Sequence, residues 1–139
     1  MRLYDFIEKG YVKKISKDIA LAKSLVATAK KDLVFLKKLS IDKISARRIL
    51  GNYYDVLRSI LEAISVLDGY KIYSHEAFTY FLKEKGENLI AEKFDRLRKI
   101  RNSINYYGKN VSVEEARENV DEIIKLIKFL IRRYLKLRI

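Results

Sequence analysis

The side chains best suited to chemistry lie in one run, RLRKIRNSINYYGK, at residues 96–109. If this run is helical, Arg98, Arg101, Asn102 and Asn105 fall at positions i, i+3, i+4 and i+7 and form one polar stripe. Arginine donates charge-assisted hydrogen bonds to phosphate oxygens, and the asparagine amide both donates and accepts. The stripe therefore predicts a binding site for the phosphate of a nucleotide or of RNA.

Tyr106 and Tyr107 directly follow this stripe. Aromatic rings stack on nucleobases, which would extend the predicted site. Half-buried packing at a dimer interface is an equally good use of two tyrosines. The two asparagines also have a plainer alternative, because asparagine is common at helix ends and Gly108 follows closely.

The charge balance favours a polyanionic partner. The chain holds 30 Lys and Arg against 18 Asp and Glu, a formal net charge of +12. An excess of one sign favours RNA, DNA or nucleotides as partners, although a lysine-rich surface is also typical of thermophile proteins. There is no cysteine and only one histidine, His75. We therefore expect no thiolate chemistry, no metal site and no cofactor, and we expect His75 to be a capping or surface residue near Ser74.

Apolar residues at helical spacing predict four long helices, within residues 15–36, 49–67, 90–104 and 116–134. Shorter helices are expected at residues 74–86 and at the N-terminus, where the pattern ends near Gly10.

The helix ends predicted from turn and capping residues agree with these limits. Gly86 and Gly108 are suited to end helices, and SVEE at residues 112–115 matches a capping box. Asp42 or Ser45 is expected to cap the second long helix.

No segment shows a convincing strand pattern, and residues 68–73 are expected to form a loop. Tyr53 lies on an apolar stripe and Tyr54 lies off it, so Tyr54 is expected at an interface. Because the connections are short, residues 1–139 are predicted to form a single all-α domain. Its expected architecture is an antiparallel up-and-down bundle of four long helices plus one or two short ones.

The segment RNSINYYG, in the late helix of an all-α chain, resembles the signature of the HEPN superfamily. In that signature an Arg is followed by a polar residue and, a few residues later, by a His. Three further segments are similar to archaeal members: residues 8–38 to their first helix, GYKIYSHEAFTYFL to their central turn, and NYYGKNVSVEEA to the lead into their last helix. The resemblance covers nearly the whole chain.

The resemblance implies a helical bundle that dimerises. In the ribonuclease members, Arg and His from both subunits meet at the dimer interface and cleave RNA without metal. Other members bind nucleotides or pair with a minimal nucleotidyltransferase, as in toxin–antitoxin systems. Here Arg101 takes the Arg position and Asn102 the polar position, but Tyr106 stands where the His is expected.

A tyrosine with a pKa near 10 is poorly matched to proton transfer near neutral pH. We therefore predict a non-catalytic, homodimeric module that binds nucleotide or RNA phosphate, alone or for a nucleotidyltransferase partner. The alternatives are a metal-independent endoribonuclease with an altered site and a structural helical dimer without ligand. The absence of a signal-peptide pattern and of a membrane-length apolar run predicts a cytoplasmic protein without membrane contact.

Overall fold

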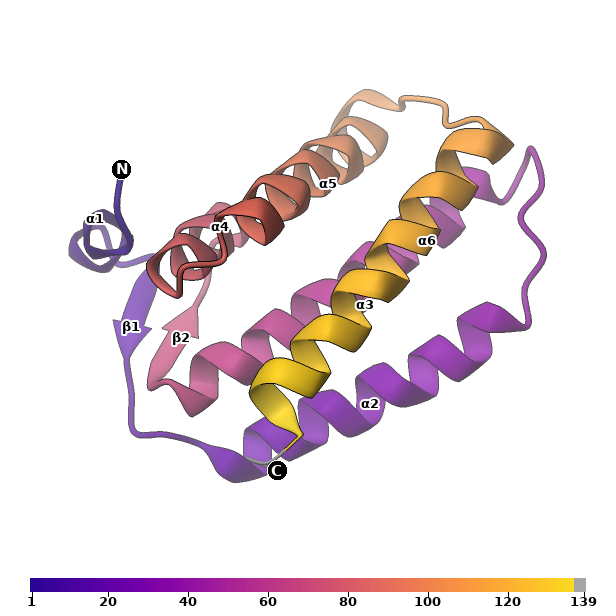
Figure 1. The fold of residues 1–139 in the computed structure, drawn as a ribbon. Coiled ribbons are helices and arrows are strands. Elements are labelled where there is room, and N and C mark those ends of the chain that lie inside the picture. Colours follow the sequence, from indigo (N-terminus) through magenta and orange to yellow (C-terminus); the bar gives the residue numbers. More distant parts are fainter. Residues whose placement is uncertain (137–139) are drawn as a thin grey trace.

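A computed structural model describes residues 1–136 of the 139-residue chain (Figure 1). Its elements, in chain order, are α1 (Leu3–Glu8), β1 (Val12–Lys14), α2 (Ile19–Lys37), α3 (Ala46–Leu67), β2 (Tyr70–Ile72), α4 (His75–Glu84), α5 (Asn88–Tyr107), α6 (Val113–Leu130) and a final π-helical turn, η1 (Ile131–Leu135).

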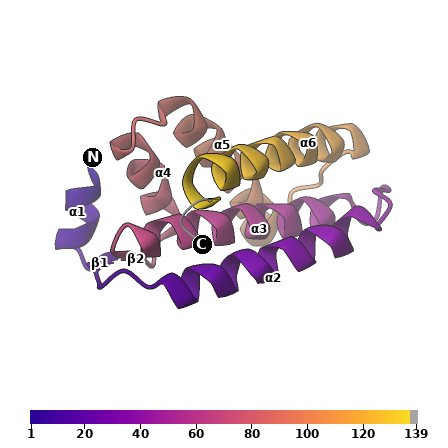
Figure 2. The ribbon, with the colours of Figure 1, turned by 60° about the horizontal axis from the view of Figure 1, so that its bottom comes forward.

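The four long helices α2, α3, α5 and α6 run alternately in opposite directions, and α1 and α4 are short (Figure 1). This confirms the predicted antiparallel bundle of four long helices with two short ones. α3 is the central helix: α2 packs on one side of it, and α5 and α6 pack on the other (Figure 2). Within residues 1–136, no helix is both long enough and apolar enough to cross a membrane.

Tyr54 shows that α3 is buried around most of its circumference. Its side chain is 1% exposed and its ring stacks on Phe94, with centroids 5.6 Å apart. The expectation that Tyr54 marks an interface is therefore wrong. Successive helical residues lie about 100° apart, so Tyr53 and Tyr54 can both be buried only when neighbours surround most of the helix. The central position of α3 provides those neighbours.

The loop expected at residues 68–73 is partly a strand. β1 and β2 form an antiparallel pair in which Val12 lies opposite Ile72 and Lys14 opposite Tyr70. Ile15, expected in the first long helix, instead follows β1, and its N–H donates to the Gly69 carbonyl at 2.9 Å. Strands of three residues are too short for an alternating pattern to reveal them.

Local capping groups fix the other helix boundaries. The Asp18 carboxylate accepts the Leu21 N–H at 2.9 Å and starts α2. The Asp42 carboxylate accepts the N–H groups of Ile44 and Ser45 just before α3. Gly108, with φ of +63°, ends α5 in a left-handed conformation that favours glycine.

Further along the chain, the Ser112 hydroxyl accepts the Glu115 N–H at 3.1 Å and so caps α6. Gly108 and Ser112 therefore fix the turn that aligns α5 against the rest of the bundle, and α5 carries most of the predicted site.

Candidate functional site

A pocket of about 530 Å³ opens beside α3, between α2 and the residues that face it from α4 and α5. Each of four helices contributes polar or aromatic side chains to its wall. These are Asp32 and Phe35 from α2, Asp55 and Arg58 from α3, His75 from α4 and Arg101 from α5. Its volume is within the usual range for small-molecule sites.

Arg101 is held in this pocket without being saturated by hydrogen bonds. Its side chain is 22% exposed, and its Nη2 lies 3.6 Å from Asp55 Oδ1. The guanidinium carbon lies 5.6 Å from the centre of the Tyr54 ring. The 3.6 Å separation is longer than a hydrogen bond, and no other acceptor among residues 1–136 bonds this guanidinium. Asp55 and Tyr54 therefore orient the group and leave its N–H donors available to a ligand.

His75 joins Arg101 in the pocket because α4 begins beside α3. The Tyr54 hydroxyl lies 3.0 Å from His75 Nδ1. Leaving the phenolic proton unpaired inside the core would be costly, so we assign Tyr54 as the donor and Nδ1 as the acceptor. The proton of the neutral ring then resides on Nε2. The expectation of a capping or surface histidine is wrong, since the ring is half-buried and bonded to a core side chain.

The pKa of His75 is lowered from its ordinary value near 6.5 to about 4, mainly by burial. The positive charges of Arg58, Arg101 and Arg98 contribute to this lowering, and Glu62 opposes it. At neutral pH the imidazole is therefore uncharged, and it offers Nε2–H as a hydrogen-bond donor. The same environment raises the pKa of the Tyr54 hydroxyl, mainly through burial, so this phenol keeps its proton.

Arg58 adds a second guanidinium to the wall. Its Nη1 lies 3.2 Å from Glu62 Oε2, one helical turn along α3, and Glu62 also bonds Lys71. Sharing Glu62 with Lys71 leaves the Arg58 guanidinium only partly neutralised. The pocket thus carries two cationic groups from different helices, Arg58 and Arg101.

A smaller pocket of about 130 Å³ adjoins the first and shares Arg101 and Asp55 with it. Its wall adds Arg47, Arg48 and Asn105. Together the two pockets are lined by four arginines and two aspartates. This excess of positive charge is what a phosphate-bearing ligand requires.

The predicted polar stripe of α5 is divided by the structure. Arg101 and Asn105 come together at the smaller pocket. Arg98 instead uses Nε and Nη2 to bond Asp95 Oδ1, at 3.1 and 2.8 Å, and lines neither pocket. Asn102 is half-buried and likewise lines neither pocket.

Tyr106 and Tyr107 lie at the end of α5, with side chains 74% and 85% exposed. Neither lines the two pockets. Both rings are therefore free for a nucleobase or for a partner chain.

The sequence alone did not identify several pocket residues, namely Asp32, Phe35, Asp55, Arg58 and His75. Asp55 and Arg58 were detectable in principle, because they are polar residues three positions apart inside an otherwise apolar segment. Phe35 carried no such signal, since an aromatic residue in an amphipathic helix normally suggests core packing.

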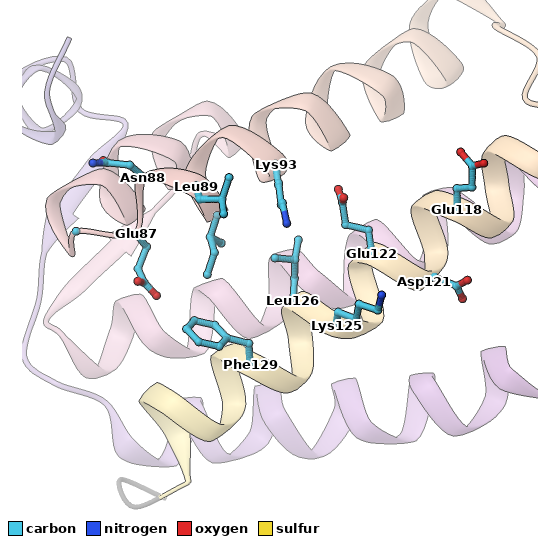
Figure 3. A pocket seen from close by; sticks show the side chains of 12 residues that line it. Glu87, Asn88, Leu89, Lys93, Glu118, Asp121, Glu122, Lys125, Leu126 and Phe129 are labelled. Carbon is cyan, nitrogen blue, oxygen red and sulfur yellow. The ribbon is translucent and has the colours of Figure 1, made fainter.

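A larger pocket of about 690 Å³ lies between the start of α5 and α6 (Figure 3). Leu89 and Phe129 contribute apolar surface to it, and Lys93 and Lys125 contribute charge. Its wall also carries the carboxylates of Glu87, Glu118, Asp121 and Glu122, which outnumber the lysines. This pocket is therefore less suited to a phosphate than the two pockets lined by Arg101. Among the described residues, no group of three His, Cys, Asp or Glu side chains is placed to hold a metal ion.

In comparisons with known proteins, no family model, no curated protein and no solved structure matches this chain. The HEPN resemblance therefore remains a prediction that rests on the sequence segments alone.

Proposed function

We propose that this protein is a HEPN-like module that binds the phosphate of a nucleotide or of RNA in the pocket around Arg101. One observation carries the proposal: a half-buried guanidinium, without a hydrogen-bond acceptor among residues 1–136, faces a 530 Å³ pocket. Guanidinium donors match phosphate oxygens in geometry and charge.

The neighbouring groups suit the same ligand. A phosphate bound to Arg101 can also accept from the Arg58 guanidinium and from His75 Nε2–H, since all three side chains line one pocket. Asp55, at 3.6 Å, keeps Arg101 in position without occupying its donors. Three donors from α3, α4 and α5 are therefore already in place, which reduces the entropy lost when the ligand binds.

Metal-independent cleavage of RNA is the second candidate, and the presence of His75 beside Arg101 favours it. A general base would remove the 2′-hydroxyl proton and a general acid would protonate the leaving oxygen. With a pKa of about 4, His75 is a weak base at neutral pH and its protonated form is scarce. Efficient general acid–base catalysis needs a pKa near the working pH, so the pocket suits binding better than cleavage.

We further propose that the module is a homodimer, with a minimal nucleotidyltransferase as a possible second partner of the toxin–antitoxin type. The exposed Tyr106 and Tyr107, at the end of the helix that carries Arg101, support the proposal. Light scattering at micromolar concentration is expected to report two chains. A stable monomer would contradict the dimer and would leave the phosphate pocket as a single-chain site.

Binding is tested with a short single-stranded RNA, using fluorescence anisotropy at low salt. Arg101→Ala is expected to lose most of the affinity, whereas Arg132→Ala, which removes the same charge from an exposed position in η1, is expected to retain it. Equal losses in the two variants would show that net charge alone holds the RNA, and the proposed pocket would then be wrong.

Cleavage is tested by incubating the same RNA with wild-type protein in the presence of a chelator and examining its length on a gel. We expect intact RNA. Metal-independent cleavage that disappears in both His75→Asn and Arg101→Ala would favour the ribonuclease over the binding module.

A further inference from the structure

The wall of the pocket opposite Arg101 is chemically different from the rest. The ribbon of α3 lies between those of α2 and α5 (Figure 2). Because Asp32 and Phe35 of α2 line the same pocket as Arg101 of α5, they face it from the opposite side. There Phe35 is 58% exposed, although phenylalanine is usually among the most buried residues. Asp32 lies three positions earlier and therefore on the same face of α2. An exposed aromatic ring and a carboxylate thus lie together at one end of a pocket whose other end carries guanidinium groups.

The charge distribution gives a bound ligand a direction. Two guanidinium groups, Arg58 and Arg101, outweigh the single Asp55 carboxylate beside Arg101 and attract phosphate, whereas the Asp32 carboxylate on α2 repels it. An uncharged base, in contrast, gains by stacking on the Phe35 ring. A nucleotide in this pocket therefore places its phosphate at the α5 end and its base at the α2 end.

The Asp32 carboxylate then selects among bases. A carboxylate only accepts hydrogen bonds, so it favours a base edge that carries adjacent donors. Guanine has two such donors side by side, N1–H and the exocyclic 2-amino group. Adenine and cytosine each place an acceptor nitrogen beside their amino group, and uracil has a single N–H between two carbonyl oxygens.

We propose that Phe35 and Asp32 form a base subsite that selects guanine, so that the ligand of this pocket is a guanine nucleotide or a guanosine within RNA. This inference rests on the proposed phosphate site and adds the identity of the base. Phe35 provides the stacking surface and Asp32 reads the Watson–Crick edge.

Calorimetric titration with GMP, IMP, AMP and inorganic pyrophosphate tests the subsite. IMP lacks only the 2-amino group, so wild-type protein is expected to bind GMP at least about fivefold more tightly than IMP. Asp32→Asn, nearly equal in shape, is expected to remove this preference. Phe35→Ala is expected to weaken all three nucleotides about 5- to 100-fold, with Phe35→Tyr as the conservative control. Pyrophosphate binding is expected to be unchanged in both Phe35 variants and to tighten slightly in Asp32→Asn, which removes a negative charge from the pocket wall.

The outcomes separate the base subsite from the phosphate site. Equal affinity for GMP, IMP and AMP, or no change in Phe35→Ala, overturns the base subsite, while Arg101-dependent pyrophosphate binding keeps the proposed function. Failure of wild-type protein to bind either pyrophosphate or nucleotides overturns both. A Phe35→Ala variant that changes the oligomeric state but not nucleotide affinity would assign Phe35 to contact between copies, and the subsite would again be wrong. Circular dichroism melting shows that each variant is folded before it is compared.

Discussion

Arg98 and Arg101 lie three positions apart on α5, but one is bonded to a carboxylate and the other faces a pocket. Arg98 is 14% exposed and bonds Asp95 twice, and the same carboxylate oxygen lies 3.3 Å from the Thr79 hydroxyl of α4. Arg101 is 22% exposed and lies 3.6 Å from Asp55. The first arginine is paired within α5 to a carboxylate that also contacts α4, and the second leaves its donors facing a pocket.

The difference lies in where the carboxylate is placed. Asp95 is on the same helix as Arg98 and reaches it at 2.8 Å, so the pair is complete within α5. Asp55 comes from α3, and the spacing between the two helices holds it slightly beyond hydrogen-bond distance of Arg101. A carboxylate within hydrogen-bond distance uses up the N–H donors of a guanidinium. A carboxylate slightly farther away orients the guanidinium but leaves those donors available. This contrast favours a structural role for Arg98 and leaves Arg101 available for the proposed binding of phosphate.

The largest expected effect is the loss of ligand affinity in Arg101→Ala. A hydrogen bond to a charged group contributes about 1.5–3 kcal/mol, so affinity for RNA is expected to fall about 10- to 100-fold. The free energy of unfolding is expected to change by less than about 0.5 kcal/mol, as for other sites without essential partners. Anisotropy titrations and urea unfolding measure the two quantities. A large loss of stability would place Arg101 with the structural arginines.

Arg98→Ala is expected to show the reverse pattern. It leaves the partly buried Asp95 carboxylate without its main partner, which costs about 1–3 kcal/mol of stability. Affinity for RNA is expected to stay within about threefold of wild type, since Arg98 lines neither pocket. The same unfolding and anisotropy measurements apply, and a loss of affinity without a loss of stability would erase the contrast between the two arginines.

Stability is expected to depend on pH through His75. Its pKa is near 6.5 when unfolded and about 4 when folded, so the unfolded chain binds the proton more tightly. The contribution is complete above pH 6.5 and is lost as the pH falls from 6.5 towards 4. Allowing for solvent around the half-buried ring, the loss is about 1–2 kcal/mol.

Thermal unfolding between pH 4 and 7 measures the effect, with His75→Asn as the control that lacks it. Arg101→Ala is expected to reduce the effect, because it removes one of the positive charges that lower the pKa of His75. Equal pH profiles in wild type and His75→Asn would show that the histidine does not carry this dependence.

The smallest expected effect is a gain in affinity in Asp55→Asn. Asparagine keeps the shape beside Arg101 but removes a negative charge from the wall shared by both pockets. Affinity for RNA is expected to rise about two- to fivefold at low salt and to approach the wild-type value at high salt, where charges are screened. A decrease would mean that the orientation supplied by Asp55 outweighs its repulsion of phosphate.

The sequence predicted the long helices well, because apolar residues such as Ile60, Ile64 and Ile123 recur at helical spacing and are buried as expected. It missed β1 and β2, since the partners Val12 and Ile72 are far apart in the chain and each strand is too short to show a period. Helical spacing reports one local period and contains no information on such long-range pairing.

Only part of the candidate site could be predicted from the sequence. Arg101 and Asn105, which line the smaller pocket, were singled out because they share one face of a single helix, and spacing alone reveals this. The placement of His75 against Tyr54 depends on how α4 meets α3, and Phe35 depends on α2 lying across α3 from α5. Those relations arise from packing between helices and could not be found within any single segment.

The two-stranded sheet also has a kinetic consequence. It joins Lys14 to Tyr70, and its neighbouring bond from the Tyr73 N–H to the Tyr11 carbonyl, at 2.8 Å, lies just before His75. The chain between these partners contains all of α2 and α3, so pairing the strands means closing a long loop, and contacts this distant in sequence slow folding. We therefore expect the helices to associate first and the start of α4 to become fixed late in folding. A refolding chain would then acquire its helical signal before His75 reaches the pocket and before the proposed phosphate site is complete.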